Sequence, residues 1–264
     1  MINSMQKAII MKDFKSVAAN KNLMPALIIV PSVFTVIFPL IFILIIYFVP
    51  DQMDDFESMV EMLPEQLRSN NMNEMVIALL LDFIMPMFFM MIPIITSSIM
   101  SASSFIGEKE KRTLETLLYS PLSLTQIFQS KVWASFMLSM LVTLASFALM
   151  LITMETGAFL ILGTLILPGI SWIFILFLVA PAISLLAIVL IVRGSAKSKT
   201  IEESQQRSLY LIMPVILLVI SQFTGIILIN AWFLLVTGAV LGLLAWFMMK
   251  KSMNKFTYEL LLKR

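Results

Sequence analysis

Long apolar runs constrain this chain more than any other feature of its sequence. The clearest of them covers residues 158–192, which contain no charged side chain. About 20 consecutive apolar residues form a helix that crosses the hydrocarbon core of a bilayer. Only 13% of the 264 residues are charged, whereas a soluble domain has about 25%. The sequence therefore predicts an all-α integral membrane protein with a single transmembrane domain over residues 1–264.

Six membrane spans account for the apolar runs. We place them at residues 24–49, 77–106, 132–153, 163–192, 209–229 and 231–249. Three further segments are distinguished: residues 1–23 before the first span, the loop at 107–131 and the tail at 250–264. Several spans contain proline, which removes a backbone donor and tends to kink a helix. Bent helices are therefore expected, and they occur in moving and in static bundles alike.

Lysine and arginine indicate the orientation of the spans. All basic residues except Arg68 fall in four segments that would share one side, namely 1–23, 107–131, 193–208 and 250–264. Short loops rich in Lys and Arg remain in the cytoplasm. Both termini are therefore predicted to be cytoplasmic. The protein is expected to be a multi-pass component of a cell membrane, most simply a prokaryotic plasma membrane.

The segment before the first span predicts a short amphipathic helix over residues 5–18. At 100° per residue, its apolar side consists of Ile10, Met11, Phe14, Val17 and Ala18. The polar residues Lys12, Asp13, Lys15 and Ser16 fall mostly on the other side. A basic amphipathic helix that leads into a span lies in the membrane interface. We expect it on the cytoplasmic side.

The loop at 107–131 is the one long stretch in the middle of the chain that carries dense charge. Its pattern predicts a helix over residues 108–119, in which opposite charges such as Glu108 and Arg112 can pair four residues apart. The apolar stripe of this helix consists of Leu114, Leu117 and Leu118. These leucines must be buried, either against a partner protein or against the chain itself.

A proline turn and a second helix start follow the predicted helix. Pro121 cannot continue a helix. Ser123 and Gln126 then have the spacing of a capping box, in which each side chain bonds the backbone of the other residue. We therefore expect a new helix to begin here and to run into the third span.

Residues 107–132, GEKEKRTLETLLYSPLSLTQIFQSKV, resemble the loop between the second and third spans in permease subunits of the type-two ABC exporter superfamily. The matching positions are Glu108-Lys109-Glu110, Thr113-Leu114-Glu115, Leu117-Leu118 and Pro121. The segment SKTIEESQQRS is similar to the Glu-Ala-Gln region of that family, with Ser204 in place of the usual Ala. The chain departs from the family between the last two spans, where only Asn230 and its neighbours could form an outer segment.

The resemblance implies a coupling helix that docks into a groove on a separate cytoplasmic ATPase. The implied contact residues are Glu108, Lys109, Glu110, Thr113, Leu114, Glu115, Leu117, Leu118 and Pro121, with the charges at the rim. It also implies two ATPase subunits and a second permease, either a copy or a paralogue. The chain lacks a Gly-Lys-Ser/Thr phosphate loop. ATP and magnesium are therefore expected on the partner, with no cofactor bound by this chain.

Polar residues within the predicted spans are candidates for a translocation path. Ser97, Ser101 and Ser104 fall on one face of a helix, at i, i+4 and i+7. Small hydroxyl residues also permit close helix packing, and this alternative remains open. Gln222 and Thr224 are further candidates. Asp82 is expected at the outer interface rather than at membrane depth.

The leading functional hypothesis is a permease subunit of an ATP-driven ABC exporter, without catalytic residues of its own. The alternatives are a non-transporting sensor or regulatory subunit and an intramembrane enzyme. The chain has no Cys and no His, which excludes thiolate nucleophiles, imidazole bases and the usual zinc sites. No metal site and no nucleic-acid partner are expected. Peptides, drugs, lipids and ions all remain open as substrates.

Overall fold

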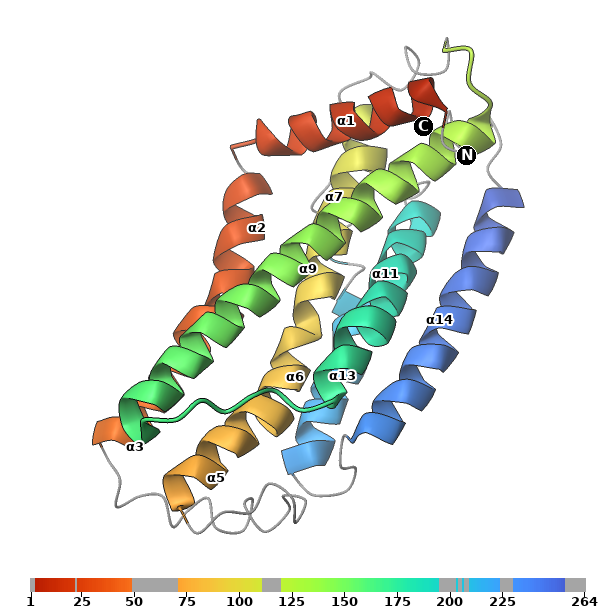
Figure 1. Ribbon diagram of the computed structural model, residues 1–264. Coiled ribbons are helices and arrows are strands. Elements are labelled where there is room, and N and C mark those ends of the chain that lie inside the picture. Colours follow the sequence, from red (N-terminus) through yellow and green to blue (C-terminus); the bar gives the residue numbers. More distant parts are fainter. Residues whose placement is uncertain are drawn as a thin grey trace.

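The computed structural model describes residues 3–21, 23–48, 71–110, 120–194, 203, 206, 209–223 and 230–254. Within these residues the regular structure is entirely helical, which confirms the all-α prediction. Most helices run side by side in an elongated bundle, and α1 (Ser4–Ala18) lies across one end of it (Figure 1). We call this end the α1 end and the opposite one the far end.

Five helical runs in the described part of the chain are long and apolar enough to cross a membrane. They are Leu23–Phe48, Met72–Glu108, Leu124–Leu162, Ser171–Gly194 and Ala231–Met253. They overlap the first, second, third, fourth and sixth predicted spans and support a multi-pass membrane protein. The fourth helix begins at Ser171, whereas residues 163–170, placed at the start of that predicted span, are not helical. Where the fifth span is predicted, α13 covers Leu209–Phe223, and residues 224–229 lie outside the described residues. The count of six spans therefore stays a prediction.

Three of these runs contain a wide π-helical turn. The first run consists of α2 (Leu23–Ser32), η1 (Val33–Ile37) and α3 (Phe38–Phe48). The second consists of α5 (Met72–Leu79), η4 (Leu80–Ile84), α6 (Met85–Phe89) and α7 (Met91–Glu110). The fourth consists of α10 (Ser171–Phe174), η5 (Ile175–Val179) and α11 (Ala180–Gly194). Each π turn interrupts an otherwise continuous membrane-length helix.

The position of a proline explains each π turn. Pro39, Pro86 and Pro181 each lie two residues after the last π residue, at the second position of the next α-helical segment. A proline ring clashes with the carbonyl four residues earlier, and the ring has no N–H to bond it. The wider turn accommodates the ring, and the residue before each proline bonds the carbonyl five residues back. Three of the span prolines are therefore accommodated by π turns, whereas Pro31 and Pro214 lie inside α-helices.

The longest helix, α9 (Leu124–Leu162), has 39 residues and is about 58 Å long at 1.5 Å per residue. Ser123 caps its start: Gln126 N donates to Ser123 Oγ at 3.3 Å, and Ser123 N donates to Gln126 Oε1 at 3.0 Å. These two bonds confirm the predicted capping box. Gly163 ends the helix at φ +71°, in the left-handed region that favours glycine. Since a bilayer core is about 30 Å thick, α9 must extend beyond it.

The α1 helix forms where the sequence predicts it, but it buries a different face. Its buried residues are Gln6, Ile9, Asp13 and Val17. Of the predicted apolar side only Val17 is buried, whereas Met11 is 58% exposed. Asp13, predicted on the solvent side, faces the bundle instead. Polar partners on α7 and α9 account for the buried polar residues of α1, because Ser104 donates to Asp13 and Gln6 donates to the Gln126 carbonyl. The exposed apolar side, with Met11, remains available to the membrane interface, and that placement stays a prediction.

Basic side chains gather at the α1 end of the bundle. Lys12 and Lys131 meet there through a shared carboxylate. Arg193, near the end of α11, donates to the Met248 carbonyl of α14 (Ala231–Asn254) at 2.8 Å. Lys250 lies 5.4 Å from the centre of the Trp246 ring. This clustering follows the predicted one-sided charge distribution, and the assignment of the α1 end to the cytoplasm stays a prediction.

An acidic side chain fixes the connection between α9 and α10 at the far end. Gly169 N donates to Asp82 Oδ1 at 2.8 Å, and a Cβ at Gly169 would lie only 3.1 Å from both carboxylate oxygens. Next to it, Trp172 Nε1 donates to the Leu81 carbonyl at 3.2 Å. Asp82 thus has a structural role toward the end of the bundle opposite α1, and its place near the outer interface stays a prediction.

Candidate functional site

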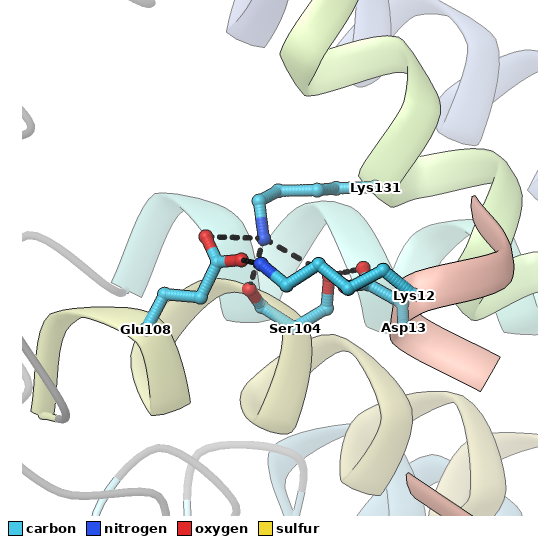
Figure 2. Close-up of polar contacts among 5 residues, drawn as sticks. All are labelled: Lys12, Asp13, Ser104, Glu108 and Lys131. Atoms are coloured by element: carbon cyan, nitrogen blue, oxygen red, sulfur yellow. Dashed lines mark hydrogen bonds and ion pairs between the residues drawn. The ribbon is translucent and has the colours of Figure 1, made fainter. Parts of the chain in front are cut away.

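A buried cluster of charged side chains lies beneath α1, at the point where α7 leads into the charged loop. We call Lys12, Asp13, Ser104, Glu108 and Lys131 the charge cluster (Figure 2). They come from α1, α7 and α9. Lys131 is only 2% exposed, Glu108 7% and Asp13 8%. Charged residues are almost never this buried unless they are paired, so their partners decide what the cluster does.

Helix geometry brings the five side chains together. Ser104 and Glu108 are four residues apart and therefore share one face of α7. Lys131 lies about two turns beyond the Ser123 cap of α9. Because α1 packs across α9 and α7, its adjacent residues Lys12 and Asp13 both reach the α7 face. Three elements that are distant in the sequence thus meet at one point.

Glu108 is the centre of the cluster. Its Oε2 lies 2.7 Å from Lys131 Nζ, and its Oε1 lies 2.5 Å from Lys12 Nζ. Lys131 also donates to the Ser104 carbonyl, and its ammonium lies 5.5 Å from the centre of the Phe105 ring. One carboxylate therefore joins α7 to both α1 and α9.

Asp13 extends the network on the α1 side. Ser104 Oγ donates to Asp13 Oδ2 at 2.5 Å. Burial raises the pKa of Asp13 above its ordinary value of 3.8, while the nearby Lys131 and the bond from Ser104 act in the opposite direction. With two lysines and two acids, the ionised cluster is formally neutral. A balanced network of this kind tolerates burial far better than any one of its charges alone.

The predicted ATPase-contact residues fall at the edge of the described chain. Glu108 is ion-paired beneath α1, so the expectation of a rim position for it is wrong. Lys109 and Glu110 form the last turn of α7, and their side chains are not described. Pro121 is exposed between α7 and α9. The remaining contact residues, Thr113, Leu114, Glu115, Leu117 and Leu118, lie outside the described residues, so the coupling helix stays a prediction.

The serines proposed for a path are buried in the bundle. Ser97 and Ser101 are both 0% exposed, and each donates its hydroxyl to the carbonyl one turn earlier. This is the arrangement expected for close helix packing. Ser104 belongs to the charge cluster. Of the other two candidates, Gln222 lies in α13 with its side chain not described, and Thr224 lies outside the described residues.

A row of hydroxyls connects three central helices that the sequence did not link. Thr96 Oγ1 on α7 lies 3.0 Å from Ser139 Oγ on α9, which lies 3.4 Å from Ser184 Oγ on α11. All three residues are 0% exposed. Small side chains let helix backbones approach closely in a membrane protein, and hydroxyls can bond across the contact. The row therefore links α9 to both α7 and α11, which also pack directly on each other.

Sequence reasoning missed three members of the charge cluster: Lys12, Asp13 and Lys131. Hydropathy places Lys12 and Asp13 on the polar side of α1, and Lys131 counts only as one of the basic residues that indicate the orientation of the spans. One available indication was the i, i+4 pair of Ser104 and Glu108, which places two polar groups on one face at the end of an apolar helix. That pattern requires polar partners, but it does not say which helices supply them.

The cluster is suited to holding helices rather than to covalent chemistry. Its lysines are engaged with a carboxylate, so neither presents the free amine that nucleophilic catalysis needs. In the described part of the chain, no group of three or more His, Cys, Asp or Glu residues could hold a metal ion.

Comparisons of the chain with family models, with curated proteins and with solved structures find no match.

Proposed function

We propose that this chain is the membrane-spanning permease subunit of an ATP-driven ABC exporter. It forms the translocation path together with a second permease, and separate cytoplasmic ATPase subunits bind and hydrolyse ATP. One observation carries the proposal beyond the sequence resemblance. Glu108, which begins the motif resembling the coupling loop, is buried and ion-paired to both α1 and α9. The loop that would receive the ATPase therefore starts from a three-helix junction.

Such a junction can transmit a displacement of the loop. Pulling Glu108 away from its lysines would leave charges unpaired in a buried site, which costs several kcal/mol. It costs less to move α1, α7 and α9 together. Because α9 is continuous over 39 residues, a tilt imposed at the α1 end would reach the far end.

The π turns supply places at which the other spans can bend. η1 and η4 lie in the first and second spans, and η5 lies in the fourth. A π turn before a proline lacks the regular i to i−4 bonding of an α-helix, and such turns occur frequently at functional sites. A permease that alternates between two arrangements needs rigid helices with a few defined hinges. The combination of a stiff α9 with three interrupted spans fits that need.

Substitution of the leucine stripe tests the proposal. The tagged chain is purified in mild detergent from cells that carry its neighbouring genes, and ATP hydrolysis by the complex is measured. Leu117→Asp with Leu118→Asp should remove the ATPase, because each buried leucine contributes about 1.5–3 kcal/mol and a buried carboxylate opposes binding. The matched control, Leu117→Met with Leu118→Met, should keep it. An ATPase that remains stoichiometric and active with the aspartate variant would refute the proposed contact.

A further inference from the structure

A cavity of about 430 Å³ lies beside the charge cluster, between α1, α7 and α9. Its polar lining includes Lys12, Asp13, Ser120 and Ser135. Its apolar lining includes Phe14, Met100 and Leu138. Cavities of about 300–1,000 Å³ with an apolar wall and a few polar groups are typical of small-molecule sites.

Two hydroxyls in this cavity have no hydrogen-bond partner within the described chain. Ser135 is 2% exposed, and its Oγ is unpartnered. Ser120 Oγ is likewise inaccessible to solvent and unpartnered. Buried polar side-chain atoms nearly always have a partner, and each exception calls for an explanation. A ligand with a polar group near Ser120 and Ser135 would satisfy both.

A second, almost wholly apolar cavity of about 350 Å³ continues the first. The two cavities share four wall residues: Phe14, Val17, Met100 and Leu138. The second cavity runs along the corner between α1 and α2 and against α9, where Ile28 is 57% and Leu141 60% exposed. Exposed apolar residues of a span face lipid, so this cavity opens toward the bilayer. Together the two cavities change from polar to apolar along their length, as an amphiphile does.

The charges at the mouth indicate the class of head group. Lys12 and Lys15 lie on α1 beside the two cavities, and the Lys12 side chain is half exposed. The cavity's carboxylates already have partners, since Asp13 accepts from Ser104 and Glu108 is paired with both lysines of the cluster. Basic residues next to a span attract anionic lipid head groups. An ammonium group has three donors, so Lys12 can bond Glu108 and a phosphate together.

We infer that the two cavities form one binding site for an anionic phospholipid of the leaflet at the α1 end. The phosphate lies near Lys12 and Lys15, with polar head-group oxygens reaching Ser120 and Ser135. One acyl chain passes Met100 and Leu138 into the corner between α2 and α9. The lipid fills the space beneath α1 and secures that helix to the bundle. This inference does not depend on the chain being a permease.

Lipid binding to the purified full-length chain tests the inference. The chain is stripped of lipid in detergent and titrated with dioleoyl phosphatidylglycerol or with dioleoyl phosphatidylcholine. Bound lipid is counted by native mass spectrometry. We expect one saturable phosphatidylglycerol that binds at least about tenfold more tightly than phosphatidylcholine. Absence of a saturable lipid, or equal binding of the two lipids, overturns the assignment.

Variants place the lipid in this cavity rather than elsewhere on the bundle. Ser135→Phe fills the cavity and should weaken phosphatidylglycerol binding at least about tenfold. Thr156→Phe, which introduces the same aromatic side chain at an exposed hydroxyl residue near the other end of α9, should leave binding unchanged. Should the Ser135→Phe protein fail to fold, Ser135→Ala removes one hydrogen bond and should weaken binding about two- to tenfold. Unchanged binding in a folded Ser135 variant overturns the site.

Discussion

The two sides of the Glu108–Lys131 pair should respond differently to mutation. Glu108→Gln removes the one carboxylate that, among the described residues, is in ion-pair contact with Lys131, whose side chain is 2% exposed. Its ammonium is then left with the carbonyl and hydroxyl of Ser104 and the Phe105 ring, and it keeps only a longer-range attraction to Asp13. Lys131→Met, in contrast, leaves Glu108 paired with Lys12, whose side chain is 50% exposed. The glutamine variant should therefore be the more damaging of the two.

The structure sets the expected order of the losses in free energy of unfolding. An unpaired buried charge costs about 3–5 kcal/mol, which we expect for Glu108→Gln. Lys131→Met should cost about 1–3 kcal/mol, because Glu108 keeps one partner. Lys12→Met should cost no more than about 1 kcal/mol, since that pair is partly exposed to water. The double variant Glu108→Gln, Lys131→Met should be more stable than Glu108→Gln alone, because it contains no unpaired buried lysine.

Equilibrium unfolding in mixed micelles, followed by far-ultraviolet circular dichroism, measures all four variants against the unmodified chain. The helical signal is large because the described chain is built of helices. Two outcomes would show that the reasoning is wrong. One is a Lys131→Met protein less stable than the Glu108→Gln protein. The other is a double variant whose loss equals the sum of the single losses, because additivity means that the two residues do not interact.

Three further predictions follow from single residues. Burial raises the pKa of Asp13 above its ordinary value of 3.8. The stability that this shift contributes is therefore present below the unfolded-state pKa and is lost as pH rises through the folded-state pKa. In the Asp13→Asn variant, the free energy of unfolding measured across this pH range should no longer show that loss. Gly163→Ala should lower the free energy of unfolding by about 1–2 kcal/mol because φ at this residue is +71°. Gly242→Ala should be neutral or stabilising, because its new Cβ meets only Ala182, at 3.9 Å. Thermal unfolding measures both variants. In intact cells, a cysteine at Ser123 should be shielded from an impermeant thiol reagent and one at Ser58 should react; labelling at Ser123 would reverse the predicted orientation.

Local features of this protein were readable from the sequence. The apolar runs give the five described membrane-length helices, because length and hydropathy are properties of a single segment. The Ser123–Gln126 capping box depends only on residues three apart, and it forms as predicted. Prolines 39, 86 and 181 mark where three helices are interrupted, although the π geometry of those turns appears only in the structure.

The contacts between helices were decided by the tertiary structure. Hydropathy places Asp13 on the polar side of α1, yet the fold buries it against the bundle. The reason is that a polar side chain can be buried wherever another helix offers a partner. For Asp13 that partner is Ser104, which is 91 residues away in the sequence. A pattern within one segment contains no information about such a partner, so the charge cluster and the cavity beside it exist only once α1, α7 and α9 are packed together.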